Sequence, residues 1–151
     1  MIAAAWLFGI GGVVLVGIGG FFLFARPALL PEDLRYLDRA DTEIDAAVPG
    51  LRGWLRLVFT VLGGYAAATG ILTVYVAATE MRDAGPSAVA VLAVTGAGSI
   101  GVMAVVNFVL HSAFRWLLLA AAGLWIAAAV VAAVAPKPAA ERGKARPGQR
   151  Q

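Results

Sequence analysis

The chain contains no cysteine, a single histidine and little charge, since Asp, Glu, Lys and Arg make up 14% of its 151 residues. Without cysteine it forms no disulfide and offers no thiolate to a metal, and one histidine excludes bis-histidine haem ligation. The serines number three, which leaves no material for a Ser-His-acid triad. No phosphate-binding or dinucleotide-binding glycine motif lies outside the apolar segments. We therefore expect no enzyme, no catalytic or metal site and no cofactor.

Four long stretches of the chain carry no charge at all. They cover residues 2–24, 57–79, 87–110 and 116–135, and all twelve Lys and Arg and all nine acids lie outside them. A helix rises about 1.5 Å per residue, so about 20 to 24 residues cover the roughly 30 Å of a bilayer's hydrocarbon core. With 61% apolar residues and a mean hydropathy of +0.85, the sequence predicts an all-α integral membrane protein with four transmembrane helices.

The connections between these stretches differ in length. The last two hold seven and five residues and predict tight antiparallel hairpins, so residues 1–135 are expected to form one up-down four-helix domain. The first connection, 25–56, holds five Arg and six acids. Pro31, Glu32 and Asp33 are typical of a helix start, and apolar residues follow near helical spacing. We expect a short amphipathic helix over 31–48 that lies in the membrane interface.

Residues 136–151 form a tail with five Lys or Arg against one acid, rich in Pro, Ala and Gly, and we expect it to be flexible. Lys and Arg divide six to six between the two sides of a four-span topology, so the positive-inside count is a tie. The basic tail favours cytoplasmic termini, and the Ala-, Val-, Gly- and Arg-rich composition favours a bacterial inner membrane. Contact with anionic lipid headgroups accounts for the basic charge of the tail, so we expect no nucleic-acid partner.

Two polar rows recur at i,i+4 spacing near or within the spans, and both are candidate ligand or partner contacts. The first comprises Asn107, His111 and Arg115, and the second comprises Tyr65, Thr69 and Thr73. The first row suggests a pocket for a quinone or a lipid headgroup, with His111 as a hydrogen-bond donor. Alternatively, these residues are hydrated, or hydrogen-bonded to neighbouring helices, at the end of a span. The second row is expected to face protein, with each threonine hydroxyl donating to its own helix.

Small residues recur at four-residue intervals in three spans, where they allow helix backbones to approach closely. They are Gly63 and Ala67 in the second span, Ala93, Ala97 and Gly101 in the third, and Gly123 and Ala127 in the fourth. The spans contain no ionisable residue at depth, which argues against an ion-coupled pump. The sequence favours a structural or accessory subunit that contacts lipids and packs with itself or with other membrane subunits. The alternative is a passive carrier or binder of a lipid, quinone or other small apolar solute.

Overall fold

The computed structural model describes residues 2–79 and 86–135, and the regular elements of these residues are all helices. Four of them are long and apolar enough to cross a membrane. They are α1 (Ile2–Phe24), α4 (Leu51–Thr79), the rod formed by α5 (Pro86–Gly96), the π-helix η1 (Ala97–Gly101) and α6 (Val102–Val109), and finally α7 (Arg115–Val134). The prediction of an all-helical chain with four such helices is confirmed. The predicted tail, 136–151, lies outside the described residues.

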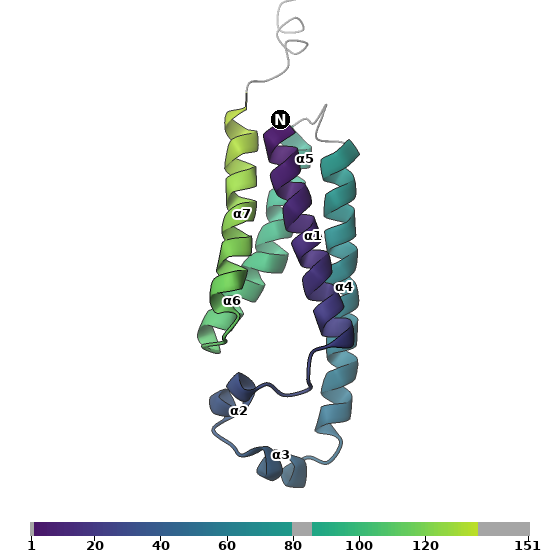
Figure 1. The fold of residues 1–151 in the computed structure, drawn as a ribbon, viewed down its shortest axis with the longest axis vertical. Helices are drawn as coiled ribbons and strands as arrows, with labels where there is room; N and C mark the ends of the chain where they lie inside the picture. The colour runs from purple at the N-terminus through teal and green to yellow at the C-terminus, as the bar shows by residue number, and fades with distance from the viewer. Residues whose placement is uncertain (1, 80–85, 136–151) are drawn as a thin grey trace, which may run out of the picture.

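The second long helix begins six residues before its predicted start. Gly50, at φ 92, ends the preceding segment in the left-handed conformation, and no proline stands between it and the apolar stretch. Arg52 and Arg56 therefore lie on α4 itself. At 29 residues, α4 is longer than a hydrocarbon core requires, and it extends past the end of α1 (Figure 1).

The single helix predicted over 31–48 is wrong, because the structure divides this segment into α2 (Pro31–Leu37) and α3 (Asp41–Ala47). Asp38 takes the left-handed conformation at φ 51, which a short polar side chain tolerates better than most. The helix starts are set by acids: Asp33 accepts the Leu30 N–H at 2.9 Å, and Glu43 accepts the Ala40 N–H at 3.2 Å. The near-helical spacing of apolar residues continues across this break, so it does not reveal where α2 ends.

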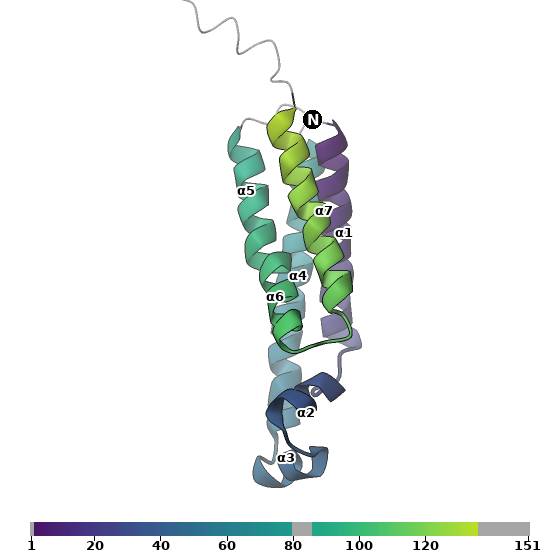
Figure 2. The same ribbon diagram turned by 90° about the vertical axis from the view of Figure 1, so that its left-hand side faces the viewer.

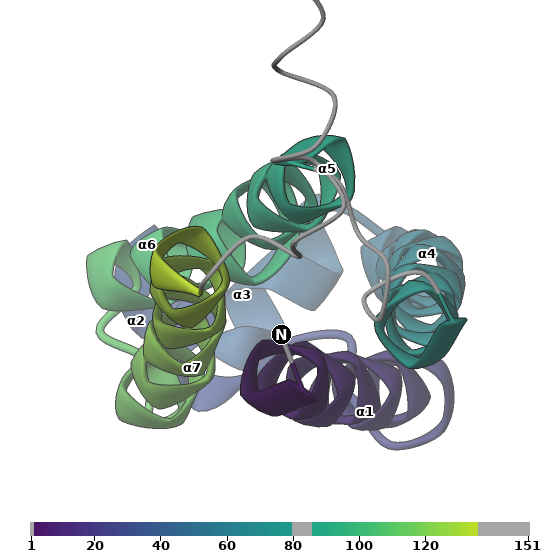
Figure 3. The same cartoon turned by 90° about the horizontal axis from the view of Figure 1, so that it is seen from above.

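Consecutive long helices run in opposite directions (Figures 1 and 2). Seen along their axes, α1 lies between α4 and α7, and α5 lies beside α7 (Figure 3). The buried core is built chiefly by α1, α7 and the α5–α6 rod, with α4 contributing Ala77. The helix α4 therefore packs mainly against α1, and it makes far fewer contacts with α5.

Glycines bring α1 and α4 together along a seven-residue repeat. A Cβ added at Gly12 would lie 2.8 Å from the Gly70 carbonyl oxygen, and one added at Gly19 would lie 2.7 Å from the Gly63 carbonyl oxygen. Both clashes are with backbone, so the helices are closer than any larger residue permits. In lipid, where apolar surface gains little from leaving the solvent, such close backbone contact is a principal source of helix association.

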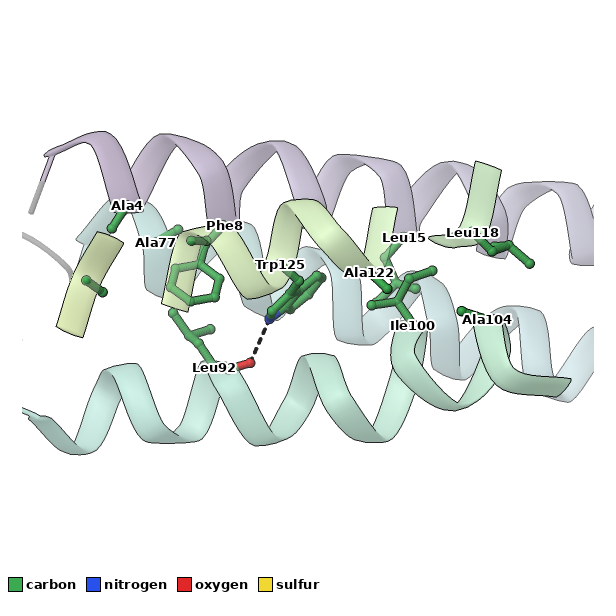
Figure 4. Close-up of a cluster of buried hydrophobic side chains, with 12 residues drawn as sticks. Ala4, Phe8, Leu15, Ala77, Leu92, Ile100, Ala104, Leu118, Ala122 and Trp125 are labelled. Carbon is green, nitrogen blue, oxygen red and sulfur yellow. Dashed lines mark hydrogen bonds between the residues drawn. The ribbon is translucent and has the colours of Figure 1, made fainter. Parts of the chain in front are cut away.

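A tryptophan of α7 fills the space where α7 meets α1 and α5 (Figure 4). Trp125 of α7 is 3% exposed, and its indole Nε1–H donates to the Leu92 carbonyl of α5 at 2.8 Å. Its ring meets Phe8 edge to face, with centroids 6.0 Å apart. Added Cβ atoms at Gly96 and Gly11 would lie 2.2 and 3.0 Å from this ring, so two glycines make its slot.

Candidate functional site

Polar and aromatic side chains from several segments meet just beyond the end of α1. Arg26 forms an ion pair with Asp33, with Nη2 3.2 Å from Oδ2, and its Nη1 donates to the Pro27 carbonyl at 2.9 Å. The Arg26 guanidinium carbon lies 3.5 Å from the centre of the Phe59 ring and 5.4 Å from that of Phe22. The cation of Arg26 is thus held between a carboxylate of α2 and aromatic rings of α1 and α4.

Burial lowers the pKa of the Arg26 guanidinium from its ordinary value, and the carboxylate of Asp33 opposes this by stabilising the charged form. The group remains protonated, since arginine keeps its charge in proteins. Its side chain is 9% exposed, so Asp33 and the two rings replace most of its water. These contacts fix the start of the first connection against the helices.

Glu32 and Ser112 join the first connection to the turn between α6 and α7. Glu32 is 6% exposed and Ser112 is 1% exposed, and the Ser112 hydroxyl donates to Glu32 Oε1 at 2.8 Å. The same hydroxyl oxygen accepts the Phe114 N–H at 3.1 Å, and the Phe114 ring lies 5.9 Å from that of Phe21. One buried hydroxyl therefore positions both the turn and α2.

Sequence reasoning missed this pair. In the sequence, Glu32 is an acid at a helix start and Ser112 is one of three serines. Eighty residues separate the two, and no spacing rule connects them. The one available signal was topological, since both lie in connections on the same side of the predicted membrane.

The structure brings together two of the three residues in the row Asn107, His111 and Arg115. The helix α6 ends at Val109, so the row does not continue as a single helix face. Arg115 Nη1 donates to the His111 carbonyl at 3.0 Å, while the Asn107 amide donates to the Met103 carbonyl of its own helix at 2.9 Å. The His111 ring is exposed, and its backbone lies in the left-handed region at φ 50.

The row in α4 bonds back to its own helix. The Thr69 hydroxyl donates to the Tyr65 carbonyl at 2.8 Å, and the Thr73 hydroxyl donates to the Thr69 carbonyl at 2.9 Å. Thr73 is 2% exposed, whereas Tyr65 is 71% exposed. The row thus passes from the helix interface to the outer surface, and Tyr65 does not face protein within the chain as expected.

The predicted rows of small residues also divide between helix interfaces and the outer surface. Gly63 and Ala67 lie against Gly19 of α1. In the third and fourth spans, however, Ala97, Gly123 and Ala127 are exposed, while Ala93 and Gly101 are half-buried.

The buried row of the α5–α6 rod, which is the third span, lies one residue earlier than the predicted row of small residues. It comprises Leu92, Gly96, Ile100 and Ala104. The insertion of Trp125 at Gly96 selects this face. No sequence pattern indicates this face, because a helix that is apolar on every side has no amphipathic phase.

Two of the three acids of α3 form exposed ion pairs. Arg52 of α4 bonds to Asp41, and its Nε lies 2.7 Å from Asp45 Oδ1. Within residues 2–79 and 86–135, no three His, Asp or Glu side chains gather as metal ligands. No protein family matches the chain, and comparison with characterised proteins and with solved structures finds no similar one.

Proposed function

We propose that the chain is a structural or accessory membrane protein that packs with copies of itself or with other membrane subunits. The observation that carries this proposal is that polar side chains of the long helices form hydrogen bonds within their own helix. The hydroxyls of Thr60, Thr69, Thr73, Thr79 and Ser99 and the amide of Asn107 all donate to carbonyls four residues earlier in the same helix. Groups bonded in this way are typical of helix packing rather than of a conduction path or a reaction centre.

Outward-facing glycines supply surfaces for a second chain. An added Cβ at Gly9, Gly17 or Gly20 of α1, or at Gly123 of α7, would meet no atom within 4 Å. The glycines on the inner faces are used for close helix contacts, so these outer ones stand free within one chain. Glycine in a helix costs about 1 kcal/mol relative to alanine, and the approach of another helix to the outer glycines of α1 and α7 would offset this cost.

The proposed setting is a bacterial inner membrane, with the four long helices as an up-down bundle that spans it. In this arrangement α2 and α3 lie in the interface on one side, where the exposed rings of Tyr36 and Trp54 would meet lipid headgroups. The proposed role is non-enzymatic, and the partners are lipids and membrane proteins.

Purification in a mild detergent tests the proposal. We expect a particle larger than one chain, or co-purifying membrane subunits. The substitutions Gly17→Leu and Gly123→Leu should reduce this association while leaving the fold intact, because both sites have open space around them. The matched control is Gly64→Leu, an open site on α4 outside the proposed faces. A strictly monomeric particle with no partner would refute the proposal.

The alternative function, a passive carrier or binder of a lipid, quinone or other apolar solute, is favoured by one observation. The His111 ring is exposed in the α6–α7 turn and its backbone holds φ 50, a conformation that is uncommon outside glycine and recurs at functional sites. Mass spectrometry of the purified protein would decide this. A small molecule that co-purifies with the native chain and is lost in His111→Ala would support the carrier.

A further inference from the structure

The turn between α6 and α7 lies at the end of the long helices that carries α2 (Figure 2). It ends at Arg115, directly before the uncharged run that starts at Trp116. In the proposed membrane setting Arg115 therefore lies at the edge of the hydrocarbon core, where lipid headgroups begin. The exposed rings of Phe114 and Trp116 follow it in this layer, and the guanidinium carbon of Arg115 lies 5.9 Å from the centre of the Trp116 ring.

The guanidinium of Arg115 is held in place while one of its edges is unused. Its Nη1 donates to the carbonyls of His111, at 3.0 Å, and Ser112, at 3.4 Å. Arg26 and Arg52 each pair with a carboxylate, but Arg115 pairs with none in the described part of the chain, where its Nε and Nη2 also have no acceptor. The Nε–Nη2 edge of a guanidinium is planar and carries two parallel N–H donors, which match two oxygens of a phosphate.

His111 stands where the end of a helix ordinarily has glycine. Its N–H donates to the Phe108 carbonyl at 3.1 Å, and the Ser112 N–H donates to the Asn107 carbonyl at 3.0 Å. This pair of bonds is the Schellman helix end, in which the residue at the place of His111 is left-handed and most often glycine. His111 adopts this conformation at φ 50, so the turn keeps an exposed ring at a cost in backbone energy that glycine would avoid.

The ring of His111 offers a hydrogen-bond acceptor. Its Nδ1 lies 3.1 Å from the Val109 carbonyl oxygen, and because a carbonyl only accepts, Nδ1 carries the proton. In the neutral imidazole Nε2 is then the acceptor. The turn therefore combines the unused donor edge of Arg115 with an exposed acceptor on His111.

We propose that this turn binds the headgroup of a phospholipid, with the phosphate on the Nε–Nη2 edge of Arg115 and a donor of the headgroup on His111 Nε2. The headgroup must then carry an N–H or O–H beyond its phosphate, as ethanolamine and glycerol do and choline does not. The inference rests on the membrane setting of the proposed function and names a ligand for the site of the alternative function. It does not depend on the packing role.

Native mass spectrometry of the full chain in detergent, with equal concentrations of dioleoyl phosphatidylethanolamine and dioleoyl phosphatidylcholine, tests the headgroup. The two lipids have the same net charge, and we expect about fivefold more of the ethanolamine lipid to be bound, the ratio that one hydrogen bond provides. His111→Gly should abolish this preference without lowering the melting temperature, because glycine takes the left-handed conformation freely. Equal binding of both lipids by the native chain, or a preference that survives in His111→Gly, would overturn the inference.

Arg115→Gln tests the phosphate contact. It should reduce the bound ethanolamine lipid about tenfold or more, because hydrogen bonds to a charged group are lost. Arg115→Lys keeps the charge but not the planar edge, and it should bind about fivefold less. The matched control is Arg56→Gln, which removes the same charge from an exposed side chain of α4 at the same end and should leave binding nearly unchanged. Equal losses in Arg115→Gln and Arg56→Gln, or native binding by Arg115→Lys, would overturn the site.

Two further outcomes separate the lipid from a free anion and from the packing role. Excess sodium phosphate should not displace the bound lipid, and displacement would show that the ligand is free phosphate and overturn the phospholipid. A monomer that retains the ethanolamine lipid would support the site and refute the packing role. An oligomer that retains no lipid would overturn the site and leave the packing role standing.

Discussion

Replacing Gly96 by alanine should destabilise the protein, although alanine is the better helix former. Gly96 has ordinary right-handed helical angles, so the substitution by itself gains about 1 kcal/mol of helix propensity. The added methyl group, however, would lie 2.2 Å from both Cδ1 and Nε1 of Trp125. The ring has no space to retreat, because Gly11 of α1 borders its other side.

The costs exceed this gain. Overpacking a close-fitted site costs about 1–3 kcal/mol, and a displaced ring loses the hydrogen bond to Leu92, worth about 0.6–1.7 kcal/mol between membrane helices. The net loss in the free energy of unfolding is therefore about 1–4 kcal/mol. Gly64→Ala is the matched control, because that glycine lies inside α4 with no atom near an added Cβ, and it should be neutral or up to about 1 kcal/mol stabilising.

Thermal unfolding of both variants in one detergent, followed by far-ultraviolet circular dichroism, measures the two opposite signs. A Gly96→Ala protein at least as stable as the native one would refute the reasoning. Trp125→Phe provides a second check, since the smaller ring lacks the N–H and leaves more space at Gly96. In that background the cost of Gly96→Ala should fall by about 1 kcal/mol or more, and strictly additive effects would contradict the contact between the two residues.

Other predictions use the same unfolding assay. Ser112→Ala removes the hydroxyl donor to the buried Glu32 and should cost about 1–3 kcal/mol, whereas Ser112→Thr, which keeps a hydroxyl, should cost less. Gly12→Leu should separate α1 from α4, because its Cβ would lie 2.8 Å from the Gly70 carbonyl oxygen, and a folded protein of native stability would contradict this contact. Arg52→Gln removes two exposed ion pairs and should change stability by less than about 1 kcal/mol, so a larger loss would show that these pairs matter more than exposed pairs usually do.

The number of long helices and their approximate bounds were predictable from the sequence because lipid imposes a strong rule. Each helix in hydrocarbon must satisfy its own backbone over about 20 residues, so an uncharged run of that length has few other solutions. The helix α1 begins and ends where the uncharged run does. Where water replaces lipid, the rule weakens, and Asp38 divides the predicted 31–48 helix with a conformation that the apolar spacing does not reveal.

The faces that pack together were less predictable. In a soluble protein the polar side of a helix marks its exposed face, but here the exposed and buried faces have the same composition. Gly12 and Gly17 look alike in the sequence, yet one is buried against Gly70 and the other faces outward. The pair of Glu32 and Ser112 was equally hidden, since it depends on where two distant connections meet.

The π-helix explains how a row of residues at four-residue spacing stays on one face of the third span. In an ideal α-helix, Leu92 and Ala104 would differ by about 120° after three turns. The π turn absorbs one extra residue, which reduces the difference to about 20°. Deleting Gly98, which is exposed and within the π turn, should therefore restore a regular α-helix with Ile100 and Ala104 still facing the core. Deleting the exposed Val105 should instead rotate one side of the helix out of register and lower the melting temperature. Equal losses from both deletions would show that the π turn does not set the phase.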